Sequence, residues 1–308
     1  MSSRSLLLLL FLSSSVSPLS AQGTRLLRDP TLSQDHVAFT YGADLWVAPR
    51  GGGLARRLTA TPAVESGPHF SPDGRWIAFS SDRSGVPSVY VVSVDGGEPL
   101  RLSWYPAPSY AQGWTNDGRR VLFSSTRETA PTGYERLWTV SREGGPSTLL
   151  PAPWAHDASF SPDGNRVAIE RVTRWDWEWR GYRGGQNTPL VIMDLESLEE
   201  TRLPNPDRTT DRYPVWIGDK VFFLSDRDWA MNVWSYEVGS GTLAQVTRFN
   251  DADVKTLSGG PAGLVFERDR NRALRSDMRN RRTDKRHQQR VQPFEIRRRK
   301  RLPDLAAQ

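Results

Sequence analysis

The sequence predicts an all-β protein, a six-bladed β-propeller whose sixth blade is incomplete. Three observations predict this fold: a motif that recurs at the spacing of propeller blades, turn residues between short apolar runs, and no sustained 3.6-residue period that would indicate helices. Four short strands in roughly 40–45 residues are typical of a propeller blade. β-Sandwiches and β-helices do not repeat a four-stranded unit of this length.

The repeated motif joins a tight turn to an apolar strand. In its clearest copy, the turn Ser71–Gly74 carries Pro, Asp and Gly at the positions that favour them, and the apolar run Trp76–Phe79 follows. A further run such as Ser88–Val92 and a short last strand such as Pro99–Leu102 complete the unit. Counted from their first strands, the copies begin at Leu32, Phe70, Trp114, Phe160, Trp216 and Leu257, at intervals of 38, 44, 46, 56 and 41 residues. They predict five full blades and the opening half of a sixth, which would leave the ring open.

The chain divides into three parts by composition. Residues 1–21 are typical of a secretory signal, with Arg4 before the apolar run Leu6–Leu12 and Ala21 at the expected cleavage position. The apolar run is too short to span a bilayer, although an uncleaved anchor is the alternative interpretation. Residues 22–266 form the predicted propeller. We expect an exported protein, periplasmic or secreted, with no stable membrane insertion after signal cleavage.

The third part, residues 267–308, does not continue the strand pattern. From Arg268 onward there are 15 basic and 5 acidic residues, whereas the remainder has 26 basic and 30 acidic residues. The net charge of +6 therefore comes from this tail, and the propeller itself is mildly acidic. The tail is interpreted as a basic arm, a disordered extension or the product of a shifted reading frame. Nucleic acid is not an expected partner of an exported propeller.

Residue types exclude several kinds of site. The chain has no Cys, so disulfides, thiolate metal sites and a thiol nucleophile are excluded. It contains no G-x-S-x-G elbow, and its four His are interpreted as structural, hydrogen-bonded groups. Asp73, Asp117 and Asp163 recur once per blade at a turn position that favours Asp, which argues against metal binding. We predict no cofactor, no metal and no catalytic residue.

One stretch resembles a known family. Residues 179–185 read Trp-Arg-Gly-Tyr-Arg-Gly-Gly, and this W-x-G-Y-R-G-G pattern is similar to a stretch in the first propeller of tricorn-type proteases. The Ser-Pro-Asp-Gly turns, Ala43–Trp46 and Asp211–Pro214 agree with the same family over about residues 25–266. The repeats alone resemble TolB-like and prolyl-oligopeptidase-like propellers equally well.

The resemblance implies a role in peptide hydrolysis. Tricorn-type proteases continue with a second propeller, a PDZ-like module and catalytic domains that perform serine chemistry. The resemblance therefore implies a truncated serine peptidase that keeps only the N-terminal propeller, which gates or scaffolds hydrolysis and is inactive alone. Peptides or protein subunits are the implied partners, and the full-length family implies a homo-oligomer. The alternative is a non-catalytic, TolB-like periplasmic propeller that binds proteins.

The insert at residues 171–187 is the candidate contact surface. Arg and aromatic residues are enriched where proteins bury surface against partners, and Arg can pair with a peptide carboxylate. Alternating Trp residues would place three indoles on one face of an extended strand. An interface, a peptide contact and packing against a neighbouring blade are all open interpretations. The candidate residues are Arg174, Trp175, Trp177, Trp179, Arg180, Tyr182 and Arg183.

Overall fold

The strands form antiparallel sheets that follow one another in chain order. The computed structural model describes residues 27–171, 181–185 and 187–268, all of which belong to one unit, Leu26–Asp284. Blades one to five are four-stranded, and a two-stranded sheet follows them. The strands of blades one to three are β1 (Arg28–Leu32), β2 (His36–Tyr41), β3 (Asp44–Pro49), β4 (Arg56–Arg57), β5 (Glu65–Phe70), β6 (Trp76–Ser81), β7 (Ser88–Ser93), β8 (Leu100–Arg101), β9 (Ser109–Trp114), β10 (Arg120–Ser125), β11 (Arg136–Ser141) and β12 (Thr148–Leu149).

The remaining strands belong to blades four and five and the two-stranded sheet. They are β13 (Asp157–Phe160), β14 (Arg166–Glu170), β15 (Val191–Asp194), β16 (Glu200–Arg202), β17 (Asp211–Ile217), β18 (Lys220–Asp228), β19 (Ala230–Glu237), β20 (Leu243–Gln245), β21 (Val254–Gly260) and β22 (Gly263–Arg268). No helix occurs among the described residues, so the structure offers no helical segment able to cross a membrane.

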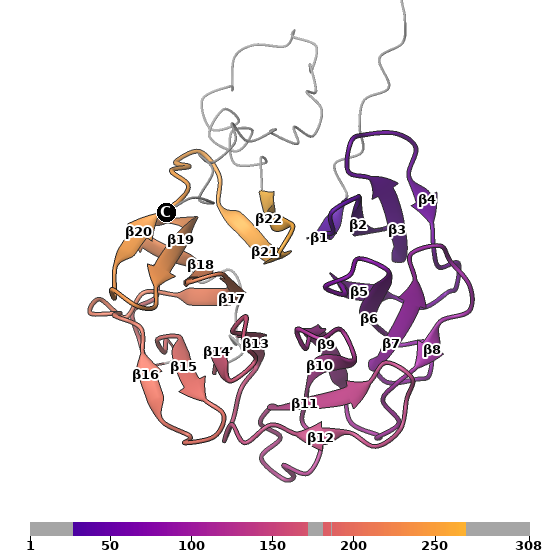
Figure 1. Cartoon of the computed structure of the whole chain (residues 1–308), viewed down its shortest axis with the longest axis horizontal. Helices are drawn as coiled ribbons and strands as arrows, with labels where there is room; N and C mark the ends of the chain where they lie inside the picture. The colour runs from indigo at the N-terminus through magenta and orange to yellow at the C-terminus, as the bar shows by residue number, and fades with distance from the viewer. Residues whose placement is uncertain (1–26, 172–180, 186, 269–308) are drawn as a thin grey trace, which may run out of the picture. The chain divides into compact units, whose positions relative to one another are not determined.

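The sheets are arranged around a common axis, and the predicted β-propeller is confirmed (Figure 1). The first strand of each sheet contacts the first strand of the next, from β1 through β5, β9, β13 and β17 to β21. β21 and β22 in turn contact β1, so the innermost strands close the ring that the sequence predicts to be open.

The blade count differs from the prediction. The sequence predicts a six-bladed propeller with an incomplete sixth blade, whereas the described residues form five four-stranded blades and a two-stranded sheet, β21 and β22. Closure of the inner ring does not need a complete sixth blade, because the first strand of a sheet makes the contact to the neighbouring inner strands.

The predicted turns have the expected geometry. In blade two, the amide of Gly74 donates to the carbonyl of Ser71 at 2.8 Å, and Gly74 has a φ of 69°, which glycine adopts without strain. In blade three, the Thr115 hydroxyl and the Arg119 amide donate to Asp117. These bonds hold the pKa of Asp117 below its usual value. The recurring aspartates are therefore turn residues.

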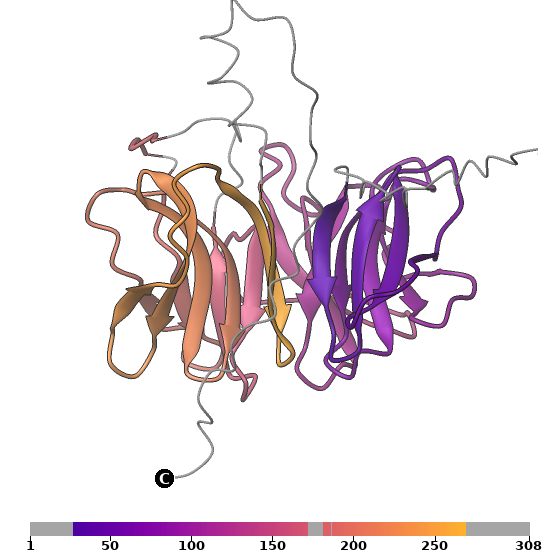
Figure 2. The same cartoon turned by 90° about the horizontal axis from the view of Figure 1, so that it is seen from above.

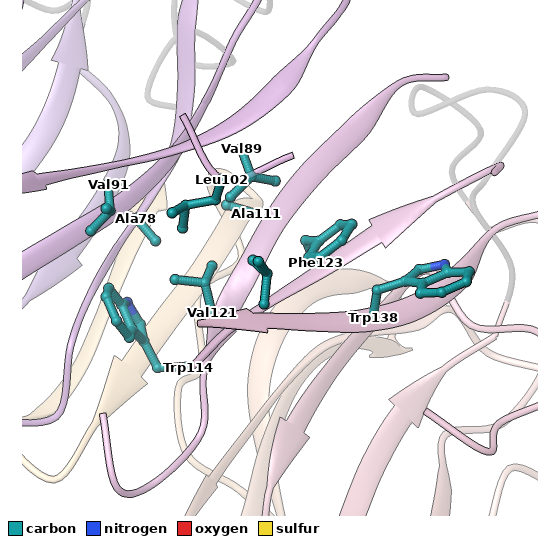
Figure 3. Close-up of a cluster of buried hydrophobic side chains, with 10 residues drawn as sticks. Ala78, Val89, Val91, Leu102, Ala111, Trp114, Val121, Phe123 and Trp138 are labelled. Carbon is teal, nitrogen blue, oxygen red and sulfur yellow. The ribbon is translucent and has the colours of Figure 1, made fainter. Parts of the chain in front are cut away.

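The core consists of apolar clusters between neighbouring sheets. Side chains of the second strands alternate between the two faces: Phe79 packs toward blade one, and Ala78 packs toward blade three. Both faces are buried, which explains why these strands read as continuous apolar runs. Figure 3 shows the cluster between blades two and three, where Trp114 and Phe123 contact residues of blade two.

The connections between strands gather at two opposite faces (Figure 2). Because consecutive strands are antiparallel, the first-to-second and third-to-fourth strand turns of every blade lie at one face, here called the turn face. The second-to-third strand connections and the links between blades lie at the other, here called the connection face. The described residues of the 171–187 insert belong to the connection face, because the insert joins β14 to β15.

Candidate interaction surface

Exposed aromatic residues are concentrated on the connection face. Trp104 is 71% exposed and Trp229 is 78% exposed, far above the usual value for an indole in a folded protein. Every exposed aromatic residue in the described part of the chain lies in a connection at this face or within two residues of one: Trp104, Tyr105, Tyr110, Tyr134, Trp154 and Trp229. Exposed aromatic side chains gathered on one face indicate a contact surface.

Several of these rings are each paired with a guanidinium group. A guanidinium over an aromatic face is attracted by the ring quadrupole, so each pair restrains the ring. Distances from the guanidinium carbon to the ring centroid are 4.5 Å for Arg101 and Trp104, 5.3 Å for Arg127 and Tyr105, 5.1 Å for Arg171 and Trp154, and 5.2 Å for Arg183 and Trp229.

Blades two and five fix the start of the connection in the same way. In blade two, Arg83 Nη2 donates to Glu65 Oε1 at 2.6 Å, and Arg83 Nε donates to Ser81 Oγ at 3.0 Å. In blade five, Arg227 binds Asp211 at 2.7 Å and the Ser225 hydroxyl at 3.1 Å. Each Arg thus ties the end of the second strand to the start of the first strand.

Blade three keeps the Arg but replaces the acid by a hydroxyl. Arg127 donates to Ser109 Oγ at 3.3 Å and to Ser125 Oγ at 3.4 Å, and its guanidinium lies 4.8 Å from the centroid of Phe123. Burial lowers the pKa of Arg127, since the charged group has lost part of its hydration. The fold therefore tolerates a neutral residue at the start of the first strand.

The described part of the insert is attached to blade five. Arg183 Nη1 donates to Asp226 Oδ2 at 2.9 Å and Nη2 donates to the Asp226 carbonyl at 3.2 Å. Asp226 is buried and also accepts a bond from the Thr210 amide at 2.8 Å. Gly181 has a φ of 62° and packs against the indole of Trp229, where an added Cβ would lie 3.4 Å from a ring carbon. The insert of blade four therefore contacts the second connection of blade five.

Only part of the predicted set can be placed. Tyr182 and Arg183 lie on the connection face: Arg183 is fixed by Asp226, and the Tyr182 carbonyl accepts a bond from Asn187. Arg174, Trp175, Trp177, Trp179 and Arg180 lie outside the described residues.

Two residues of this contact were not predicted from the sequence, Asp226 and Trp229. An indole within a polar turn, as in Asp226-Arg227-Asp228-Trp229, is a signal that could have identified it.

A group of titratable side chains lies where blades three, four and five meet. His156 Nδ1 lies 2.6 Å from Glu135 Oε2, and Glu170 Oε1 accepts a bond from Arg212 Nε at 3.3 Å. Burial lowers the pKa of His156, but the bond to Glu135 and the negative charges of Glu135, Glu170 and Asp157 together outweigh it, and the pKa is raised. Burial, reinforced by Glu170, raises the pKa of Asp157 to about 7. Among the described residues, no group of His and carboxylate side chains has the arrangement of a metal site.

His69 differs from His156 in its surroundings. It lies on β5, and burial lowers its pKa to about 4, so its ring is uncharged at neutral pH. Its carbonyl accepts a bond from the indole of Trp114 at 2.9 Å, which links blades two and three. His69 thus belongs to the packing of the inner strands.

A protein-family model matches most of the chain. The model of the tricorn protease N-terminal beta propeller domain matches residues 24–275. Tricorn protease homolog 1 of Streptomyces coelicolor is 35% identical over 204 residues, which are 66% of this chain and 19% of the relative. The putative tricorn protease homolog 2 of the same organism is 32% identical, over 68% of this chain and 18% of the relative. The chain therefore spans about a fifth of the length of these relatives.

Solved structures have the same fold. The crystal structure of the tricorn protease matches with a TM-score of 0.69 and 25% identity, over 79% of this chain and 24% of that chain. The putative TolB from Agrobacterium tumefaciens matches with a TM-score of 0.56 and 22% identity, over 69% of this chain and 73% of that chain, which shows a common fold alone. The Tol-Pal system protein TolB of Bordetella pertussis is 47% identical over 49 residues, 16% of this chain and 11% of the relative.

Proposed function

Because the chain belongs to the tricorn protease N-terminal β-propeller family, we propose that it is the propeller part of a longer serine peptidase. In this role the propeller gates or scaffolds peptide hydrolysis and performs no chemistry itself. The family match over residues 24–275 carries the proposal. The crystal structure of the tricorn protease and the Streptomyces coelicolor relative also support the proposal. In both matches, this chain covers only a minor part of a much longer chain.

The two-stranded sheet is, in this proposal, the inner half of a sixth blade. β21 and β22 both contact β1, as the first and second strands of blades one, two, four and five each contact the first strand of the following blade. The side chains of Leu264, Val265 and Phe266 are only half-buried, whereas the equivalent positions of β6 and β10 are buried. A third strand alongside β22 would cover this edge.

The connection face is the side that we propose contacts peptide or the other parts of the peptidase. It carries the exposed aromatic residues and the described part of the insert, whereas the exposed large apolar residues in the turns of the other face are the aliphatic Leu54 and Leu198. Protein subunits, including further copies of the same chain, are the proposed partners. Residues 1–21 are proposed to direct export to the periplasm or beyond, which cell fractionation would check.

Activity measurements test the central proposal. We expect the purified 308-residue chain to hydrolyse no peptide, and the coding sequence that follows it to encode a second propeller and a PDZ-like module. Peptidase activity of the chain alone that a serine-directed inhibitor abolishes would show instead that the chain is itself an enzyme.

A TolB-like binding protein is the second candidate. The 47% identity to TolB over 49 residues favours it. In that case the chain would be complete without catalytic domains, and a stop codon that ends a domain-sized reading frame would support it.

The insert provides a separate test of the interaction surface. We expect Trp177→Ala to weaken assembly at least about tenfold while lowering the melting temperature by less than about 2 °C, because interface indoles contribute mainly to binding. Analytical ultracentrifugation and thermal unfolding measure the two effects. Trp216→Ala is the control, since Trp216 is buried between blades four and five and its loss should lower the melting temperature first. The opposite ranking for Trp177 would place it in the core.

A further inference from the structure

Blade four differs from blades two, three and five at the connection-face end of its first two strands. In blades two, three and five, the Arg described above contacts a pair of residues that lie opposite each other on the first two strands, such as Glu65 and Ser81. The next cross-strand pair toward the turn face holds at most one charged side chain. These pairs are Ser66 with Ser80, Tyr110 with Ser124, and Arg212 with Leu224. At the same place in blade four, Asp157 lies opposite Glu170, so two carboxyl groups face each other. Both residues are buried.

Glu170 makes a contact between blades that a serine makes elsewhere. In blade two, Ser80 Oγ accepts a bond from the Ala111 amide of blade three at 2.9 Å. In blade four, Glu170 Oε2 accepts a bond from the Tyr213 amide of blade five at 2.9 Å, and its other oxygen accepts from Arg212. The blade four to blade five junction therefore depends on an ionisable side chain.

The groups around the pair come from every neighbouring element. His156 directly precedes Asp157, just before β13 begins, and bonds to Glu135 of blade three. Arg212 and Tyr213 face the pair from β17. On β9, burial and the charge of Glu135 raise the pKa of Tyr110. The Asp29 carboxylate of blade one adds to the rise in the pKa of Tyr213. One guanidinium, that of Arg212, thus faces both carboxyl groups of the pair.

We propose that Asp157 and Glu170 form a proton-dependent latch between blades four and five, tight while the pair holds a proton and loosened when that proton is lost. With Asp157 protonated, Glu170 carries the single negative charge that Arg212 balances. With both groups ionised, two buried like charges repel each other across the strand pair.

The sign of the pH dependence follows from the direction of the shift. The pKa of Asp157 rises to about 7 in the folded chain, from 3.8 for an ordinary Asp. The stabilisation is therefore complete below the ordinary value and is lost as the pH rises toward 7. The raised pKa of His156 acts in the same direction, since its bond to Glu135 weakens as the ring loses its proton. Acid should tighten the junction, and neutral pH should loosen it.

Hydrogen exchange of two amides in the same molecule tests the latch. Tyr213 reports the junction that Glu170 makes, and Ala111 reports the junction that Ser80 makes. Between pH 5 and pH 7.5, after correction for intrinsic exchange, we expect the opening constant at Tyr213 to rise at least about tenfold. Between the ordinary pKa of Asp and the raised pKa of Asp157, each pH unit changes the opening constant about tenfold. The opening constant at Ala111 should change less than about twofold.

Three variants separate the contributions. Asp157→Asn should remove the pH dependence at Tyr213, and Asp157→Ser is the second choice because Ser66 occupies the same place in blade two. Glu135→Gln should keep most of the pH dependence at Tyr213, because it removes the smaller contribution of His156 and leaves the Asp157–Glu170 pair in place. Parallel changes at Tyr213 and Ala111 in the unmodified chain would overturn the latch. So would persistence of the Tyr213 effect in Asp157→Asn, or its loss in Glu135→Gln.

Discussion

The junction between blades two and three and the junction that closes the ring are held together differently. The first is filled by buried side chains such as Phe123, Val89 and Leu102 (Figure 3). The second joins the two-stranded sheet to blade one through an ion pair of Arg28 with Glu267 and a bond from Ser258 Oγ to Thr31 Oγ1 at 3.3 Å. Arg28 is more than half exposed in that pair. The comparison indicates that packing between blades supplies the stability, whereas weaker polar contacts close the ring.

The largest predicted effect comes from the packed junction. Phe123→Ala should lower the free energy of unfolding by about 3–5 kcal/mol, because it removes a fully buried ring and leaves a cavity. Urea denaturation measures the loss. Trp104→Ala, which removes a largely exposed ring, is the control and should cost less than about 1 kcal/mol. Equal costs for the two variants would remove the distinction between filled junctions and exposed aromatic residues.

An intermediate effect is expected where a polar contact is buried. Arg83→Ala should cost about 3 kcal/mol, because it leaves the fully buried Glu65 without its cation. Arg142→Ala is the matched control, since its partner Glu143 is exposed and the 3.9 Å pair should contribute less than about 1 kcal/mol. Recovery of stability in the double variant Arg83→Met with Glu65→Gln would confirm that the unpaired charge causes the loss. No recovery would assign the loss to packing.

The smallest effect should come from the closing junction itself. Arg28→Ala should cost less than about 1 kcal/mol of global stability, because an ion pair that reaches solvent contributes little. Hydrogen exchange should nevertheless show faster opening of β21 and β22, since regions with few buried contacts open first. A loss above about 2 kcal/mol would show that closure contributes as much as packing does.

The fold could be predicted because its determinants are local. The turn Ser71–Gly74 and the apolar run Trp76–Phe79 carry their structure within a few residues, and repetition identifies the blade. Closure of the inner ring could not be predicted, because the partners Arg28 and Glu267 lie 239 residues apart. Nothing in the local pattern of either residue indicates the other.

The pairings within the candidate sites were harder to predict for a different reason. β5, β9 and β17 each contain a bulge, whereas the register of β13 against β14 is uninterrupted. A bulge shifts pairing by one residue, so Asp157 cannot be matched to Glu170 from sequence spacing. Likewise, Arg183 is identifiable as a candidate within the insert, but its partner Asp226 belongs to another blade.

The division of the connections between two faces bears on how such a chain can acquire new segments. The longest interval between repeats, 56 residues, contains the insert between β14 and β15, yet strands β13 to β16 pair in order. Additional residues at that end leave the hydrogen-bond register of the sheets untouched. Natural variation and laboratory grafting should therefore succeed at the ends of β14 and β18 far more often than within Ser-Pro-Asp-Gly, where one added residue would disrupt the hairpin.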